Sequence, residues 1–322
     1  MQTLSDNDAP KKSWLLRHGV TLLLSLGLLV GIGLLVYPTF SDWWNQYHQS
    51  RAIATYQEEV VAMDDEDKAQ QLNDAYAYNR QLLEAGALWN MNDSQRETYN
   101  DQLDFASNGV MGYVTITKIG VQLPIYHGTD EKILQTSIGH LEGTSLPVGC
   151  ESFDPTTNQV IDATEGTHCA LTGHRGLPSA KLFSNLDKIV EGDTFTISVL
   201  DETLTYQVDQ IRIVLPEDLS DLQIEAGQDY CTLVTCTPYG VNTHRLLVRG
   251  HRVNSALDAD SITPDALKIP RYIAIPAAGV PMLFVFLVGM LLHYRKQRAR
   301  LDERQEIDEI LERISELESS SG

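Results

Sequence analysis

Residues 232–245 read TLVTCTPYGVNTHR. A run of β-forming residues leads to a cysteine, a segment with proline, glycine and asparagine follows, and an arginine opens the next apolar run. Because β-branched residues favour strands and Pro, Gly and Asn favour turns, the pattern predicts a strand, a turn and a returning strand. A hairpin of this kind would bring Arg245 back alongside the thiol of Cys236.

A histidine ends another strand-like run upstream, in LTGHRG at 171–176. Gly173 and Gly176 flank His174 and Arg175, and glycines allow the backbone to approach a ligand closely. On a period of two, His168 and His174 share one face of the run, whereas Cys169 points to the other. Cys169 is therefore a poor candidate for a nucleophile.

The thiol, the imidazole and the guanidinium suit acyl transfer through a thioester. A free cysteine has a pKa of about 8.5 and is mostly protonated at neutral pH, so a nucleophilic cysteine needs a base or a cation nearby. His174 could supply that group, and Arg245 could donate to the oxygen that becomes charged in a tetrahedral intermediate. We expect Cys236, His174 and Arg245 to be the catalytic residues of an enzyme.

An apolar block near the N-terminus predicts a transmembrane helix over residues 18–37. The run HGVTLLLSLGLLVGIGLLV is long enough to cross a hydrocarbon layer and follows Lys11, Lys12 and Arg17. A cleaved signal peptide is the alternative, but no small-x-small cleavage site follows the run. We expect an uncleaved anchor.

A second apolar block predicts another spanning helix over residues 272–293. Arg295, Lys296 and Arg298 follow it, and positive residues beside a span mark the cytoplasmic side. Residues 1–17 and 294–322 are therefore expected inside the cell, and the region between the spans outside it. The tail carries apolar residues on one helical stripe, which predicts an amphipathic helix.

The region between the spans has two kinds of sequence pattern, one helical and one typical of β-strands. Residues 41–105 have helical spacing and almost no Gly or Pro, whereas residues 106–256 are short β-forming runs cut by turn residues. So many short strands in so few residues predict a mainly β fold, a closed or nearly closed β-barrel preceded by helices. The expected strands are 112–116, 121–126, 168–173, 193–200, 205–215, 230–234 and 245–253.

The remaining cysteines have different expected roles. Cys150 and Cys169 bracket a polar segment whose ends could close as a disulfide, and the alternative is two separate thiols. Cys231 lies at an odd separation from Cys236 on one strand, so it is expected to be a core thiol on the opposite face. None of the four cysteines shows the close spacing that is typical of metal ligands, so no metal site is expected.

The formal net charge of −20 argues against a nucleic acid or an anionic lipid face as a partner, because either would select a basic surface. The acidic residues 64–67 are most simply a solvated helix face. The predicted partner surface is instead the lipid bilayer around the two spans.

The motifs described above resemble the sortase signature. TLVTC, the arginine nine residues later and LTGHRG carry the likeness. It extends through PYGVNTHRLLVRGH, GYVTITKIGVQLPIYHGT, GHLEGTSLPVG and LPSAKLFSNLDKI. With the second predicted span, these strings resemble class C sortases, the pilin polymerases of Gram-positive bacteria.

The resemblance implies an eight-stranded sortase barrel and a two-step transpeptidation that needs no cofactor. Cys236 would attack the Thr–Gly bond of an LPXTG-like sorting signal, His174 would act as general acid and base, and Arg245 would bind substrate and stabilise the oxyanion. A lysine amine on a pilin would then resolve the thioester. Further candidates for the substrate groove or the oxyanion site are Thr235, Thr237 and Asn242.

Three alternatives and one departure accompany this interpretation. A sortase that anchors single surface proteins would share the same site, whereas a thiol peptidase of the papain type would place its cysteine before its histidine. A decayed binding module is disfavoured because all three residues are present. Class C sortases usually carry an Asp-Pro-aromatic lid, which this chain lacks. Trp89 and Asp93 are the nearest lid candidates, and the alternative is that Trp89 packs a helix end.

Overall fold

The computed structural model describes residues 14–254 and, near the C-terminus, residues 288–290, 292–297, 300, 303–305, 307, 308, 310, 311 and 313, which are helical. The α-helices of residues 14–254 are α1 (Trp14–Ala62), α2 (Asp65–Ala85), α3 (Asp93–Asn100) and α4 (Glu131–Leu134). The strands are β1 (Val110–Ile116), β2 (Val121–His127), β3 (Ile138–His140), β4 (Phe153–Asp154), β5 (Gln159–Val160), β6 (Thr167–Gly173), β7 (Thr194–Val199), β8 (Glu202–Val214), β9 (Asp229–Thr237) and β10 (His244–Val253). Short 3₁₀-helices are η1 (Thr117–Ile119), η2 (Leu186–Lys188) and η3 (Ser220–Leu222).

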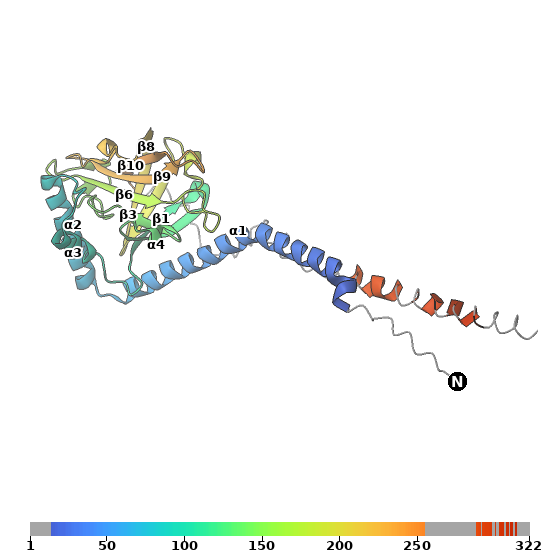
Figure 1. The fold of residues 1–322 in the computed structure, drawn as a ribbon. Coiled ribbons are helices and arrows are strands. Elements are labelled where there is room, and N and C mark those ends of the chain that lie inside the picture. Colours follow the sequence, from blue (N-terminus) through green and yellow to red (C-terminus); the bar gives the residue numbers. More distant parts are fainter. Residues whose placement is uncertain are drawn as a thin grey trace, which may run out of the picture. The chain divides into compact units, whose positions relative to one another are not determined.

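Eight strands form a closed barrel in the order β1-β2-β3-β6-β9-β10-β8-β7 (Figure 1). The pairs β2–β3 and β6–β9 are parallel, and the other pairs are antiparallel. Closure leaves the sheet no unpaired edge. The closed barrel predicted from the sequence is therefore confirmed.

β6 and β9 are buried on both faces, which explains why they read as nearly continuous apolar runs rather than alternating ones. Inner-face residues such as Leu171 and Leu233 belong to the main core inside the barrel. Outer-face residues such as Ala170 and Val234 belong to a second apolar cluster, which includes Leu222 of η3. The segment between β8 and β9 thus covers the outside of these strands.

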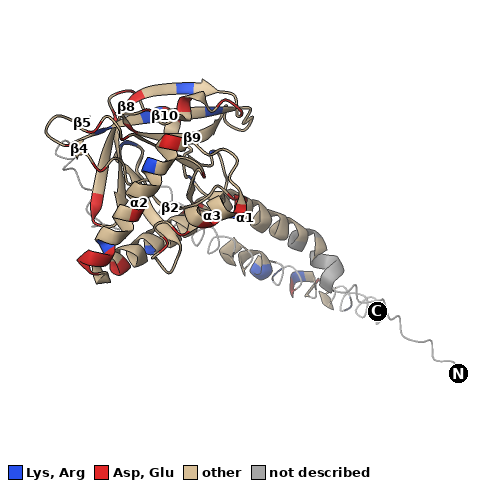
Figure 2. Cartoon of the chain, turned by 90° about the vertical axis from the view of Figure 1, so that its left-hand side faces the viewer, with Lys and Arg blue, Asp and Glu red and all other residues tan. Residues whose placement is uncertain are grey.

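α2 and α3 lie against the barrel, and their ends are capped as the sequence favours (Figure 1). The Asp64 side chain accepts a hydrogen bond from the backbone N–H of Asp67, and acidic residues fill the first turn of α2, where the helix dipole stabilises them. Figure 2 shows this acidic cluster where α1 gives way to α2. Asn92 and Gln95 form a capping box at the start of α3. The acidic run 64–67 therefore has a local structural role.

α1 is the one helix among the described residues that is long and apolar enough to cross a membrane, over Leu23–Ala62. Its apolar window is not buried against protein. From Asp42 onwards the same helix binds the barrel, for example through Tyr56, whose hydroxyl donates to the carbonyl of Met111 at 3.3 Å. The second predicted span, 272–293, lies largely outside the described residues.

The segment between Cys150 and Cys169 contains the β4–β5 hairpin, and the proposed disulfide across it is wrong. Both thiols are free. The Cys150 sulfur lies 3.6 Å from the Thr167 hydroxyl, whereas Cys169 points into the barrel opposite Cys231. The ends of the segment are held by Glu165, whose carboxylate accepts hydrogen bonds from the N–H and hydroxyl of Ser152.

Candidate active site

Three adjacent strands bring the predicted catalytic residues to one end of the barrel. β9 and β10 form the hairpin expected from the sequence, and Cys236 is the register partner of Arg245. The β6–β9 pairing ends with Thr172 opposite Val234. Two residues further along the chain lie His174, directly after the end of β6, and Cys236, near the end of β9. The thiol, the imidazole and the guanidinium therefore lie on neighbouring strand ends.

Buried hydrogen bonds hold these strand ends together. Thr235 is 1% exposed, and its hydroxyl donates to the carbonyl of Gly173 at 2.7 Å. This side chain lies on the inner face, so its assignment to the substrate groove is wrong. Thr237 is also buried and accepts a hydrogen bond from the guanidinium of Arg175 at 3.4 Å. Both threonines therefore connect the segments that carry Cys236 and His174.

The catalytic candidates share the outer face of the barrel. Val234 and Leu247 pack together in the outer apolar cluster. Because alternate residues of a strand share a face, Cys236 follows Val234 on that face, and Arg245 precedes Leu247 on it. Substrate would therefore approach from the outside of the barrel rather than from its interior.

Accessibility separates the four thiols. Cys236 is partly exposed, whereas Cys150, Cys169 and Cys231 are buried. Burial and the nearby carboxylate of Asp229 also raise the pKa of the Cys150 thiol. Cys236 is thus the thiol that a substrate or a reagent can reach most readily.

Arg245 has its guanidinium available for a ligand. Its Nη1 donates to the carbonyls of Asn242 at 3.4 Å and His244 at 3.2 Å. Within residues 14–254, no carboxylate forms an ion pair with it. Asn242 lies in the exposed β9–β10 turn with φ of 61°, so its backbone shapes the turn that positions the arginine.

A carboxylate that the sequence did not indicate contacts His174. Glu131 begins α4, and its Oε2 lies 3.4 Å from Nε2 of His174, whose side chain is 26% exposed. A hydrogen bond from Gln135, and then the nearby histidine, lower the pKa of Glu131. Glu131 is therefore ionised at neutral pH and can stabilise a positive charge on the imidazole. The contact depends on the β2–β3 connection crossing back towards β6, which no local pattern reveals.

Glu131→Gln should slow alkylation of Cys236 by iodoacetamide at neutral pH by about two- to fivefold, as expected for one exposed ion pair. The reason is that a protonated His174 stabilises the reactive thiolate, and Glu131 stabilises the protonated imidazole. The rate is measured by mass spectrometry at low and high salt, because high salt should screen the effect.

Lys132→Gln is the matched control, since it changes the charge of the next exposed residue of α4 without touching His174. It should leave the alkylation rate unchanged. An equal rate for wild type and Glu131→Gln at low salt would show that this carboxylate does not act on the histidine.

The two lid candidates lie in different surroundings. Trp89 packs into the outer apolar cluster of Ala170, Val234 and Leu247, directly beside the catalytic strand ends. The backbone N–H of Leu88 donates to the carbonyl of Gly143 at 3.0 Å and fixes the segment there. Asp93, in contrast, is exposed in the first turn of α3 and has no ion pair in the described part of the chain.

Two open hollows of the surface lie away from the catalytic candidates. They are lined by residues such as Phe153, Gln228 and Arg252, beside the β4–β5 hairpin and the start of β9. Cys236 is near the opposite end of β9. The described residues also hold no cluster of His, Cys, Asp or Glu that could bind a metal ion.

Comparison with known proteins gives consistent matches. Residues 114–253 match the sortase domain family. The chain is 57% identical to sortase C1 from Streptococcus agalactiae, with a TM-score of 0.57, covering 63% of this chain and 98% of that one. A lid mutant of sortase A from Corynebacterium diphtheriae is 38% identical, with a TM-score of 0.54, over 62% of this chain and all of that one (100%).

A pilus-related sortase C of Group B Streptococcus is 37% identical, with a TM-score of 0.50, over 62% of this chain and 96% of that one. Curated sortases match at 25% to 27% identity, and the chain spans 47% to 66% of their length.

Proposed function

The chain belongs to the sortase family, and we propose that it is a membrane-anchored cysteine transpeptidase that joins LPXTG-like sorting signals to a pilin lysine. The observation that carries this proposal is the placement of Cys236, His174 and Arg245 on three adjacent strand ends. Cys236 is also the partly exposed cysteine among four.

The proposed reaction has two steps. Cys236 Sγ attacks the threonine carbonyl carbon, the Thr–Gly bond breaks, and His174 gives a proton to the departing glycine amine. The ε-amine of a lysine then attacks the thioester, an isopeptide bond forms, and the proton released by the amine restores the thiol through His174. Arg245 stabilises the negative oxygen of both tetrahedral intermediates.

Pilin as the acceptor is supported by two observations. One structural relative is described as pilus-related, and sortase C1 is the relative with 57% identity. The second apolar block, 272–293, adds the class C arrangement of two spans. In this proposal the barrel lies outside the cell, and both chain ends lie in the cytoplasm, as the flanking positive charges indicate.

Trp89 is proposed to close the site in place of an Asp-Pro-aromatic lid. It packs against the outer apolar cluster, which includes Val234 and Leu247 of the strands that carry Cys236 and Arg245. The relative from Corynebacterium diphtheriae is a lid mutant, so a sortase similar to this chain has a lid. Asp93 makes no ion pair within the described residues, so the proposed closure is an apolar contact.

Trp89→Ala should raise the rate at which Cys236 reacts with an LPXTG peptide. Burial of a partly exposed tryptophan can stabilise the closed state by about 1.4 kcal/mol. Its loss would raise the equilibrium constant for opening, and with it the acylation rate, about tenfold. Single-turnover acylation measures the rate. Trp44→Ala, which removes an exposed tryptophan of α1, is the control and should change nothing. Equal rates for Trp89→Ala and wild type would rule out closure by this residue.

The proposed function is tested with the full chain in detergent micelles and an LPXTG peptide. Mass spectrometry should detect the chain with the peptide cleaved after threonine, and hydroxylamine should remove the adduct. Addition of a lysine-containing acceptor peptide should give an isopeptide product. Free hydrolysed peptide without that product would indicate a thiol peptidase, and absence of any adduct, also with Trp89→Ala, would reject the transpeptidase.

A further inference from the structure

Exposed apolar side chains gather at the catalytic end of the barrel. In residues 48–254, those at this end are Val190, Ile213, Leu215, Tyr239 and Val241. Elsewhere in the same residues the exposed large apolar side chains are Val61 and Ile161. Tyr239 and Val241 are each 64% exposed, in the turn that connects Cys236 to Arg245. Such a one-sided distribution marks an interaction surface rather than scattered exposure.

α1 ties this end of the barrel to the apolar segment that precedes it. The Asp42 carboxylate accepts a hydrogen bond from the backbone N–H of Lys181 at 2.7 Å, and the Asn45 amide donates to the carbonyl of Ser179 at 2.7 Å. Ser179 and Lys181 belong to the β6–β7 connection, which begins at His174. Further along α1, Tyr56 contacts Leu200 at the opposite end of the barrel. The helix therefore meets the catalytic end first.

The distance along α1 is short. The predicted span ends at residue 37, and five helical residues to Asp42 rise about 8 Å. Exposed aromatic side chains fill this interval and the next turn: Tyr37, Phe40, Trp43, Trp44 and Tyr47. Trp and Tyr prefer the headgroup level of a bilayer. The contacts of Asp42 and Asn45 therefore lie at the depth of the membrane interface.

We propose that the catalytic end of the barrel docks on the lipid surface of the membrane that α1 spans, through Ile213, Leu215, Tyr239 and Val241. This inference rests on the proposed anchoring by α1. The short connection to α1 leaves no room for the other end to face the bilayer. The outer-face site around Cys236 is then held beside the membrane surface.

The test uses the full chain in nanodiscs, with Cys236→Ala so that the remaining native thiols are buried. A bimane label is placed by Val241→Cys, or by Leu215→Cys as a second site. Ile161→Cys is the matched control, since Ile161 is 72% exposed and apolar but lies in the β4–β5 segment at the opposite end. Lipids with a nitroxide on the headgroup quench a label that lies near the interface.

We expect several-fold stronger quenching at positions 241 and 215 than at position 161. Adding Ile213→Asp should weaken quenching at 241, because a charge on this surface opposes contact with lipid. If the nanodiscs retain the chain and the labels at positions 241, 215 and 161 are quenched equally, the docking proposal is wrong, while the anchoring by α1 still stands. Loss of the chain from the nanodiscs would overturn the anchoring by α1 and the docking together, while the peptide assay above would still report on the transpeptidase.

Discussion

Cys236→Ala should abolish covalent capture of an LPXTG peptide, with a loss of about 10³-fold or more in acylation rate. The thiol is the atom that forms the thioester, and no neighbouring group can replace it. The alanine side chain is small and apolar, so the partly exposed strand end should remain folded. Mass spectrometry of the full chain with peptide, before and after hydroxylamine, measures the loss.

The other cysteines supply the controls for this result. Cys150→Ala and Cys169→Ala remove thiols that are buried and, for Cys150, shifted towards the protonated form by burial and Asp229. Both variants should still form the adduct. If the peptide is still captured by Cys236→Ala but not by Cys150→Ala, the nucleophile is Cys150 at the opposite end of the barrel. That result would contradict the proposal.

Local sequence patterns predicted much of the arrangement around Cys236. The β9–β10 hairpin follows from turn residues between two β-forming runs, and its register places Arg245 opposite the thiol. The position of His174 directly after β6 follows from the end of an apolar run. Alternation along β9 also places Thr235 on the face opposite Cys236, so the same pattern argues against Thr235 as a groove residue.

Long-range features could not be predicted in this way. β3 has three residues, too few for a recognisable pattern, and it is formed because it pairs with β2 and β6. The contact between Glu131 and His174 depends on that same crossover. Trp89 occupies the outer cluster because both faces of β6 and β9 are covered, which depends on segments distant in sequence. The expected disulfide failed because Cys169 lies in the barrel core beside Cys231, whereas the Cys150 thiol lies against the hydroxyl of Thr167.

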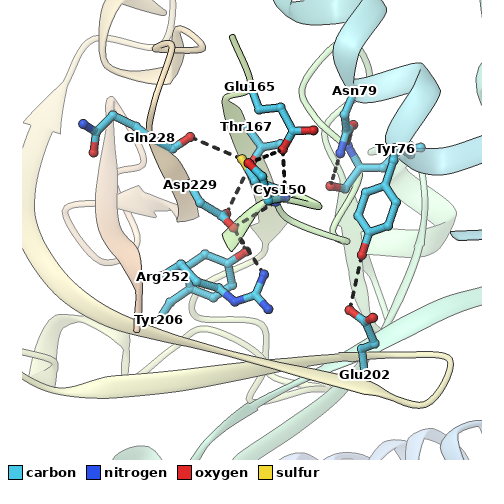
Figure 3. Close-up of polar contacts among 12 residues, drawn as sticks. Tyr76, Asn79, Cys150, Glu165, Thr167, Glu202, Tyr206, Gln228, Asp229 and Arg252 are labelled. Atoms are coloured by element: carbon cyan, nitrogen blue, oxygen red, sulfur yellow. Dashed lines mark hydrogen bonds and ion pairs between the residues drawn. The ribbon is translucent and has the colours of Figure 1, made fainter. Parts of the chain in front are cut away.

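A buried carboxylate at the start of β9 organises the other end of the barrel. The side chain of Asp229 is 1% exposed and pairs with the guanidinium of Arg252 at 3.2 Å. It also accepts hydrogen bonds from the hydroxyls of Tyr206 and Thr167 and from the backbone N–H of Cys150, each at 3.0 Å. Figure 3 shows these donors converging on the carboxylate. The ion pair is thus fully hydrogen-bonded, which burial of a charge requires.

Asp229→Ala should lower the free energy of unfolding by about 3–5 kcal/mol, because it leaves the charge of Arg252 and three donors without their acceptor. At about 2–4 °C per kcal/mol for a domain of this size, the melting temperature should fall by about 6–20 °C. Thermal unfolding of the full chain in micelles, followed by circular dichroism, measures the shift.

Glu151→Ala is the control for this change, since its ion pair with Arg80 joins side chains that are 53% and 47% exposed. An exposed pair contributes about 1 kcal/mol or less, so the melting temperature should move little. Below the melting temperature of the Asp229→Ala variant, iodoacetamide should alkylate its Cys236 at the same rate as in the wild type. The reason is that the two residues lie near opposite ends of β9. A melting temperature equal to that of Glu151→Ala would mean that the buried pair does not stabilise the barrel. A slowed alkylation in the folded variant would instead mean that the strand transmits the disturbance to its catalytic end.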